Sequence, residues 1–378
     1  MKPAYRSSSS LPLIFLFFSL SSAHNPESRG NFKGCFSQVY AFGGSGTDTG
    51  NAHFLGALPG GDDSDSSSSP VGNSTSRLSD GRLVVDFLCE ALSLPALPPY
   101  KGPYAGSTNG VNFAVAGSTA LSTDFYVSHN VSSLIWNSVP IGFQTQIEWF
   151  NTYLIKAGCK GSNARSCKVD MERSLFWIGE MGVSDYISAL HSSIPPPRLA
   201  DMSVRSVCRL LKALLDNGAK NVVVQGLPPV GCFPAYMSSK SQQKLDYMGC
   251  VATANKGVMN HNQILQHKLK TFRKLYPKCS ILYADYWNAY LTILMNPKRH
   301  HIEETFKPCC SHEGKFTFDL PSLSGSVNTS TCKDPQNFIS WDGIHLTEAM
   351  NKNLADLFLN QGFCRPSFSE LVRSKRIT

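Results

Sequence analysis

A serine flanked by glycines is the first place in this chain where chemistry could occur. The apolar, strand-like run from Tyr40 to Phe42 stops at Gly43-Gly44-Ser45-Gly46. Glycine permits the sharp backbone reversal that lifts a hydroxyl above the end of a strand, and the N–H groups of such a loop can stabilise negative charge. The loop therefore predicts either a serine nucleophile or a cradle for an anion.

The chain also contains residues that could activate a serine. A serine hydroxyl becomes a good nucleophile when a histidine takes its proton and a carboxylate holds that histidine in the right tautomer. Asp342 and His345 stand three residues apart, just before the last helical pattern. This spacing would put both side chains on the same side of a helical turn, although it also fits a helix cap beside a surface histidine. We interpret the two as a candidate acid–base pair for Ser45.

Two further strand ends could donate hydrogen bonds to an oxyanion. The run from Gly110 to Ala116 ends at Gly117, whose N–H group would point off the carboxyl end of the strand. The run from Phe176 to Tyr186 has a short polar side chain near its end, that of Ser184. Each alone also fits an ordinary turn between a strand and a helix, but donors at these places would stabilise the charge that develops during acyl transfer.

The elements that must position these residues follow from hydrophobic periodicity. Five β-rich runs alternate with helical patterns, which predicts a parallel sheet with helices on both faces. Ligands of such sheets bind outside the carboxyl ends of the strands, so we expect the three loops to converge there. The predicted strands are Gln38 to Phe42, Val111 to Ala116, Ser174 to Ile178, Asn221 to Gln225 and Ser280 to Ala284.

Three longer helices are predicted in the second half of the chain. Apolar residues from Val207 to Leu215 recur at helical spacing, and Gly218 is placed to end that helix. A second helix is expected from about Val258 to Tyr276 because Pro277 follows, and a third is expected after His345. The Ser-rich stretch from Pro59 to Ser76 predicts a surface loop within one domain.

Several of these motifs occur together, in one order, in a known family. The chain resembles the plant-type GDSL esterase/lipases of the SGNH hydrolase superfamily over nearly all of its length after residue 23. The motifs that carry the resemblance are Phe42-Gly43-Gly44-Ser45 with Asp48-Thr49-Gly50-Asn51, Ser79-Asp80-Gly81-Arg82, Gly110-Val111-Asn112-Phe113-Ala114, Trp177-Ile178-Gly179-Glu180, Asn260-His261-Asn262, and Trp341-Asp342-Gly343-Ile344-His345 with the residues up to Ala349.

The resemblance implies a three-layer α/β/α sandwich with a central, mainly parallel five-stranded sheet. It also implies hydrolysis of carboxylic esters through an acyl-serine intermediate, with no metal or organic cofactor. Ser45 would then be the nucleophile, His345 the general base and later the acid, and Asp342 its orienting carboxylate. The N–H groups of Ser45 and Gly117 would form the oxyanion hole.

The chain departs from the family pattern at three positions. Gly44 replaces the usual aspartate, Gly46 replaces an apolar residue, and Ser184 replaces the asparagine that completes the oxyanion hole. Loss of one such donor typically lowers kcat by about 10²- to 10³-fold. These changes leave open a second interpretation, a secreted binding protein that keeps the fold with impaired turnover. A third, a nucleotide-binding loop, fits poorly because Asp48 would repel phosphate.

The N-terminus predicts secretion. Lys2 and Arg6 precede an apolar run over residues 11–20, and small residues follow at 21–23. This is the pattern of a signal peptide, and the run is shorter than the roughly 20 apolar residues that a membrane span needs. We therefore expect a signal peptide at 1–23 and a single extracellular domain at 24–378.

The cysteines and glycosylation sequons agree with secretion. An oxidising compartment favours disulfides, and no CxxC pair that would indicate a metal site occurs among the twelve cysteines. The spacing suggests Cys159 with Cys167 and Cys232 with Cys250, while Cys332 could pair with either residue of Cys309-Cys310. The sequons predict glycosylation at Asn73, Asn130 and Asn328.

Charge patterning argues against nucleic acid as a partner. The formal net charge is +8, but the basic residues are spread over the helical segments, and Lys2 and Arg6 leave with the signal peptide. Glu180, Asp185 and Asp48 lie near the motifs and could tune the site, but solvation or turn capping is the interpretation that we favour for each. The expected partner is therefore a small-molecule or lipid ester, and the sequence does not indicate an oligomeric state.

Overall fold

The computed structural model describes residues 32–56, 76–104, 106, 108–129, 131, 141–160, 167–189, 194–238, 244–312 and 329–376. The predicted signal peptide, most of the loop at 59–76, and the three sequons at Asn73, Asn130 and Asn328 lie outside these residues.

Six strands form a central sheet in this part of the chain: β1 (Gln38–Phe42), β2 (Gly110–Asn112), β3 (Ser174–Ile178), β4 (Asn221–Gln225), β5 (Ser280–Ala284) and β10 (Cys364–Arg365). Their order is β10-β5-β4-β3-β1-β2. The first five strands are mutually parallel, and β10 pairs antiparallel with β5. The predicted α/β sheet is therefore confirmed, with four of its five strands at the expected bounds.

Two details of the sheet differ from the prediction. The sheet has six strands instead of five, because two residues between Gly362 and Pro366 pair with the edge of β5. Strand β2 is shorter than expected because Asn112 bends the chain: its Oδ1 accepts a hydrogen bond from the Ala114 N–H group at 2.8 Å. Two further small sheets pair β6 (Glu304–Pro308) with β9 (Phe338–Ser340) and β7 (Cys310–His312) with β8 (Thr329–Thr331).

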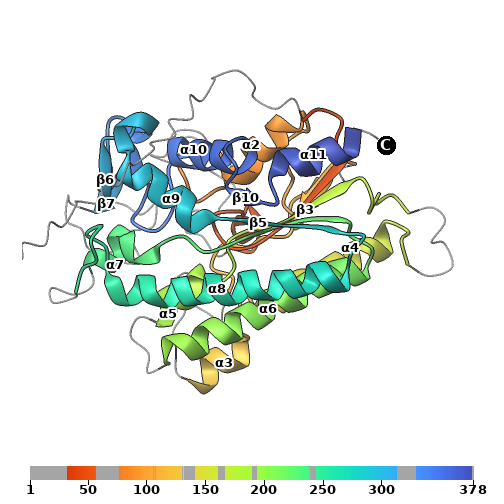
Figure 1. Cartoon of the computed structure of the whole chain (residues 1–378), viewed down its shortest axis with the longest axis horizontal. Helices are drawn as coiled ribbons and strands as arrows, with labels where there is room; N and C mark the ends of the chain where they lie inside the picture. Colours follow the sequence, from red (N-terminus) through yellow and green to blue (C-terminus); the bar gives the residue numbers. More distant parts are fainter. Residues whose placement is uncertain are drawn as a thin grey trace, which may run out of the picture.

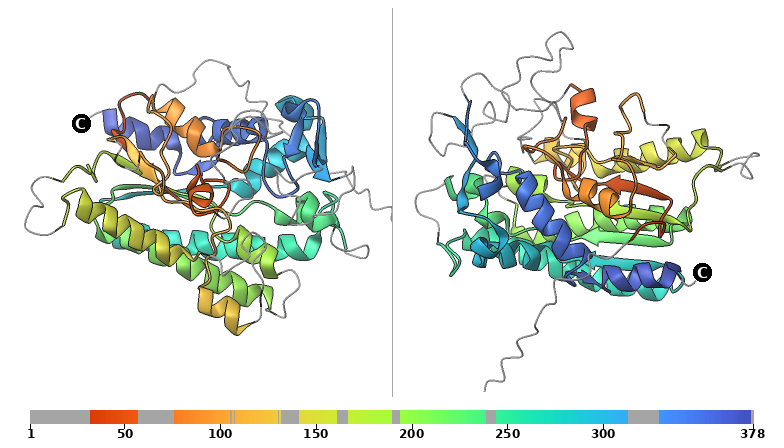
Figure 2. Two further views of the ribbon diagram at one scale, coloured as in Figure 1. Left: turned by 180° about the vertical axis from the view of Figure 1, so that it is seen from behind. Right: turned by 90° about the horizontal axis from the view of Figure 1, so that it is seen from above.

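Helices cover both faces of the sheet and make three layers (Figures 1 and 2). One layer contains α4 (Phe143–Lys156), α5 (Val183–Ser188), α6 (Pro196–Asp216) and α8 (Ala252–Leu275). The other contains α2 (Val84–Ala91), α9 (Tyr286–Met295), α10 (Glu348–Leu359) and α11 (Phe368–Arg376). The remaining helices are α1 (Asn51–Phe54), α3 (Thr123–Ser128) and α7 (Pro234–Ser238).

Alternation along β1 explains why both layers are needed. Tyr40 and Phe42 are buried in one apolar cluster with residues of α4, α6 and α8, whereas Val39 and Ala41 are buried in another with residues of α2 and α10. Successive side chains of a strand point to opposite faces, so a strand that is apolar throughout must be covered on both sides. The buried sheet is therefore rigid, and the loops that follow the carboxyl ends of its strands can present polar groups.

The predicted helix ends and disulfides are largely confirmed. Helix α6 ends as expected before Gly218, which has a φ of +102° and donates its N–H group to the Leu215 carbonyl oxygen at 3.0 Å. The disulfides join Cys159 with Cys167, Cys232 with Cys250, and Cys309 with Cys332. Of the two adjacent cysteines, Cys309 is therefore the partner of Cys332. Among the described helices, none is both long enough and apolar enough to cross a membrane.

Candidate active site

The nucleophile loop lies directly at the carboxyl end of β1. Phe42 pairs with Ile178 of β3, so Gly43 and Gly179 follow side by side. Gly43 has a φ of +146°, and a Cβ atom there would lie 3.2 Å from the Gly179 Cα atom. The positive φ therefore favours glycine, the neighbouring strand end leaves little room for a side chain, and the turn carries Ser45 to the end of the sheet.

The pair at the other end of the chain is joined by a short hydrogen bond. Asp342 Oδ2 lies 2.6 Å from His345 Nδ1, and both side chains are almost fully buried. Asp342 Oδ1 also accepts the N–H groups of Ile344 at 3.0 Å and His345 at 2.8 Å. Burial alone would raise the pKa of Asp342, but the His345 ring and these N–H groups hold it below its ordinary value.

The sequence had suggested that the pair lies in a helical turn, but it does not. Residues 341–345 form a bend, and α10 begins only at Glu348. The three-residue spacing works because the carboxylate folds back onto the two N–H groups that follow it, a local Asx-type turn that also holds the ring.

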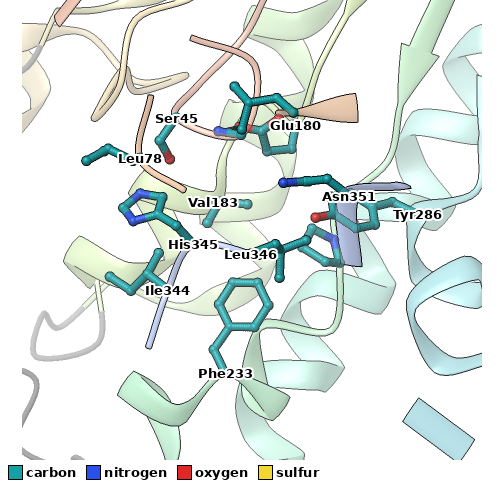
Figure 3. A pocket seen from close by; sticks show the side chains of 13 residues that line it. Ser45, Leu78, Glu180, Val183, Phe233, Tyr286, Ile344, His345, Leu346 and Asn351 are labelled. Atoms are coloured by element: carbon teal, nitrogen blue, oxygen red, sulfur yellow. Dashed lines mark hydrogen bonds between the residues drawn. The ribbon is translucent and has the colours of Figure 1, made fainter. Parts of the chain in front are cut away.

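Ser45 and His345 line the same small pocket, which has mostly apolar walls (Figure 3). The Nδ1 contact with Asp342 leaves Nε2 as the second ring nitrogen, and Nε2 is buried without a hydrogen-bond partner among the described residues. A neutral imidazole that donates from Nδ1 accepts at Nε2. The other lining residues are Gly46, Leu78, Leu83, Glu180, Val183, Pro228, Phe233, Tyr286, Ile344, Leu346 and Asn351.

Asp48 ties the nucleophile loop to the segment that carries Gly117. Its carboxylate accepts the N–H groups of Gly50 at 2.7 Å, Asn51 at 2.6 Å and Ala52 at 3.0 Å, and that of Ala116 at 2.8 Å. Burial raises the pKa of Asp48, whereas these four N–H groups favour its charged form. Asp48 was interpreted as a solvated or turn-capping residue, and it is buried and caps the turn before α1. Since its carboxylate already occupies these donors, the loop does not resemble an empty phosphate cradle.

Ser184 occupies the second position of α5, next to the pocket. It is half-buried, and its neighbour Val183 is among the residues that line the pocket whereas Ser184 is not. Gly117 is buried, has a φ of +73°, and directly follows Ala116. Ser184 thus follows the carboxyl end of β3 and Gly117 follows that of β2, as Ser45 follows that of β1.

Asp185 was interpreted as a solvated or turn-capping residue, but its side chain is buried. Its carboxylate accepts the N–H groups of Ala120 at 2.7 Å and Leu121 at 3.0 Å, and the Tyr126 hydroxyl at 3.3 Å. Burial raises the pKa of Asp185 to about 7, against the effect of these donors. The residue thus joins α5 to the segment that follows Gly117.

We expect Asp185→Asn to lower the free energy of unfolding by about 1–3 kcal/mol at pH 8. An amide can accept at one oxygen only, so its NH₂ group would face one of the two backbone N–H donors. Urea titration of the wild type and the variant measures the difference. The matched control is Asp124→Asn, at an exposed residue of α3, and an equal effect of the two substitutions would contradict the assigned role.

Two other buried polar residues near Ser45 were not recognised from the sequence. Gln146 was not singled out, and Glu180 was interpreted as solvated or turn-capping. Glu180 directly follows Gly179 at the end of β3, which is a signal that could have identified it. Gln146 lies inside α4, more than 100 positions from Ser45, and no local pattern indicates its role.

Comparison with known proteins places the chain in a family. The family model described as GDSL-like Lipase/Acylhydrolase matches residues 39–358, a range that includes Ser45, Asp342 and His345. The chain belongs to the GDSL-like lipase/acylhydrolase family. This confirms the resemblance inferred from the motifs and accounts for the three-layer fold.

Several relatives of this GDSL protein are named as esterases. A GDSL esterase/lipase of Arabidopsis thaliana is 40% identical over 96% of this chain and 95% of its own length. Acetylajmalan esterase 2 of Rauvolfia serpentina is 33% identical over 86% of this chain and 90% of its own. Sinapine esterase of Brassica napus is 31% identical over 78% of this chain and 77% of its own length. The GDSL family and these relatives support the assignment of this chain as an enzyme that hydrolyses esters.

Proposed function

We propose that the chain is a secreted hydrolase of carboxylic esters that uses Ser45, His345 and Asp342 as a catalytic triad. The observation that carries the proposal is the arrangement of His345. Its Nδ1 is held 2.6 Å from Asp342, while its unpartnered Nε2 and the Ser45 side chain share one pocket. Catalytic hydrogen bonds are often long without substrate and tighten when it binds, so the shared pocket is the relevant feature.

The chemistry then follows from the proton positions. His345 Nε2 takes the hydroxyl proton as Ser45 Oγ attacks the ester carbonyl carbon, and Asp342 stabilises the imidazolium that forms. The tetrahedral intermediate collapses to an acyl-serine as the imidazolium returns the proton to the departing alcohol. A water molecule, deprotonated by His345, then attacks the acyl carbon. When the second tetrahedral intermediate collapses, the bond to Ser45 Oγ breaks, the imidazolium gives its proton to Oγ, and the carboxylic acid is released.

The oxyanion would be stabilised by the N–H groups of Ser45 and Gly117. Neither group donates a hydrogen bond to another residue in the described part of the chain, so both are available. The half-buried Ser184 hydroxyl on α5 is the third proposed donor, which would reach the oxyanion directly or through a water molecule.

The substrate class proposed is a small-molecule or lipid ester with an apolar part. Leu78, Phe233, Ile344 and Leu346 provide apolar surface beside Ser45 and His345, as is typical of sites for organic ligands. Relatives named for acetylajmalan and sinapine agree with an ester of this kind. Three disulfides support the proposed extracellular location, since such bonds persist in oxidising compartments.

A fluorophosphonate probe tests the proposal, because it labels only a serine that an adjacent base activates. We expect the purified protein to be labelled at Ser45, with labelling lost in Ser45→Ala and retained in the control Ser203→Ala, which removes a buried hydroxyl from α6. Peptide mass mapping identifies the labelled residue. Label on another residue, or equal labelling of the wild type and Ser45→Ala, would contradict the triad.

The alternative is a binding protein with the hydrolase fold. It is favoured by the missing carboxylate at Gly44 and by the short side chain of Ser184. A folded wild-type protein that neither reacts with the probe nor hydrolyses p-nitrophenyl esters would support this second function instead of the first.

A further inference from the structure

The three glycines next to Ser45 offer no side chains that could hold the backbone on either side of it. Gly43, Gly44 and Gly46 surround Ser45, and glycine loses more conformational freedom on ordering than any other residue. A serine hydroxyl must nevertheless be held within a fraction of an ångström of its productive position. The backbone atoms directly before and after Ser45 therefore have to be restrained by other residues.

The backbone just before Ser45 is held by Gln146 of α4. Gln146 Oε1 accepts the Gly43 N–H group at 3.0 Å, and its Nε2 donates to the Gly43 carbonyl oxygen at 2.8 Å. The same Nε2 donates to Ser118 Oγ at 3.1 Å, next to the proposed oxyanion donor Gly117. The side chain is completely buried, so water does not compete for these bonds. One amide thus connects the nucleophile loop with the Gly117 segment.

The backbone just after Ser45 is held by Glu180. Its Oε1 accepts the Gly46 N–H group at 2.8 Å, and its Oε2 accepts the Thr47 hydroxyl at 3.1 Å. A Cβ atom would lie 3.0 Å from this carboxylate at Gly44 and 3.1 Å at Gly46. The two glycines therefore let the Glu180 carboxylate approach the loop closely. A carboxylate from the segment after β3 thus lies beside Gly44, where the family pattern has an aspartate.

We propose that Gln146 and Glu180 are positioning residues that fix Ser45 from both sides and so compensate for the glycines of the nucleophile loop. This inference rests on the proposed role of Ser45 as the nucleophile. Both side chains act on backbone atoms within two residues of Ser45. Their loss should therefore affect the chemical step, for which a displacement of about 1 Å can cost roughly 100-fold in rate.

A purely structural role makes a different prediction, and the chain offers a matched control. Gln38 is also a buried glutamine that clamps backbone: its Nε2 donates to the carbonyl oxygens of Thr108 at 2.8 Å and Lys168 at 2.9 Å. It lies at the amino end of β1, whereas Ser45 follows the carboxyl end of the same strand. Gln38→Leu should lower the unfolding midpoint without changing kcat per folded molecule.

The test compares Gln146→Met, Glu180→Leu, Glu180→Gln and Gln38→Leu with the wild type. Active sites are counted by fluorophosphonate titration, p-nitrophenyl ester hydrolysis gives kcat and KM, and thermal unfolding gives the midpoint. We expect Gln146→Met and Glu180→Leu to lower kcat per active site by about 10- to 100-fold with little change in KM. Glu180→Gln should keep most of the activity, since its amide oxygen can accept the Gly46 N–H group and its NH₂ group can donate to Thr47 Oγ1.

The outcomes separate this inference from the proposed function. Unchanged kcat per active site in both Gln146→Met and Glu180→Leu, with an active wild type, overturns the positioning role alone. An unlabelled, inactive wild type overturns the proposed function, and the inference with it. If Glu180→Leu does not fold, the comparison rests on Gln146→Met, where an effect no larger than that of Gln38→Leu counts against the proposal.

Discussion

Asp342→Asn is expected to lower kcat by about 10⁴-fold while the protein remains folded. The reason is the tautomer of His345. Asp342 Oδ2 accepts from Nδ1 at 2.6 Å, which leaves Nε2 free to take the proton of Ser45. An asparagine can still accept the N–H groups of Ile344 and His345 with its oxygen, but its NH₂ group then faces Nδ1. The ring must present its lone pair at Nδ1 and its hydrogen at Nε2, where it can no longer act as a base.

Steady-state hydrolysis of a p-nitrophenyl ester measures this loss, with thermal unfolding as a check on folding. Asp334→Asn is the matched control, because Asp334 is an exposed aspartate of the preceding loop. A loss of less than tenfold in Asp342→Asn would mean that another group orients His345, and the triad would have to be reassigned.

The sheet was predictable because its strands are continuous apolar runs. Strands β1, β3, β4 and β5 have the expected bounds, since full burial on both faces leaves a pattern that needs no information from distant residues. Strand β10 was missed because two residues carry no periodicity. Its position is fixed by pairing with β5, a contact that exists only in the folded chain.

The candidate triad was predictable for a different reason. Asp342 and His345 form their contact within one turn, so short-range spacing reveals it, and glycines mark Ser45. The groups that hold these residues are set by long-range contacts. Gln146 lies 103 positions from Gly43, and Glu180 lies 134 positions from Gly46.

Buried carboxylates were the main error of the sequence interpretation. Asp185 and Glu180 were interpreted as solvated or turn-capping residues, yet each is buried and accepts at least two hydrogen bonds from neighbouring segments. Their burial becomes reasonable only when these N–H and O–H donors are known, because a buried charge is tolerated where it is hydrogen-bonded. The polar groups under the site therefore could not be read from composition.

His261→Leu is expected to make the protein more resistant to acid. His261 lies in α8, is completely buried beside the Tyr186 ring, and neither ring nitrogen has a hydrogen-bond partner among the described residues. Burial lowers the pKa of His261 from 6.5 to about 3. Between these values the unfolded chain binds a proton that the folded chain does not. The buried His261 therefore does not reduce the free energy of unfolding above pH 6.5, but it reduces this free energy progressively as the pH falls from 6.5 toward 3.

The size of the effect follows from the same shift. At pH 4.5 the free energy of unfolding of the wild type is about 3 kcal/mol lower because of His261. Each pH unit below 6.5 lowers it by about 1.4 kcal/mol until the pKa of the folded state is reached. Leucine has no proton to bind, so the free energy of unfolding of His261→Leu relative to the wild type should rise by about this amount between pH 7.5 and pH 4.5. Urea titrations at both pH values measure it, with His267→Leu, an exposed histidine of the same helix, as the control. A difference that does not change with pH would show that His261 finds a partner or water in solution and is not held neutral by burial.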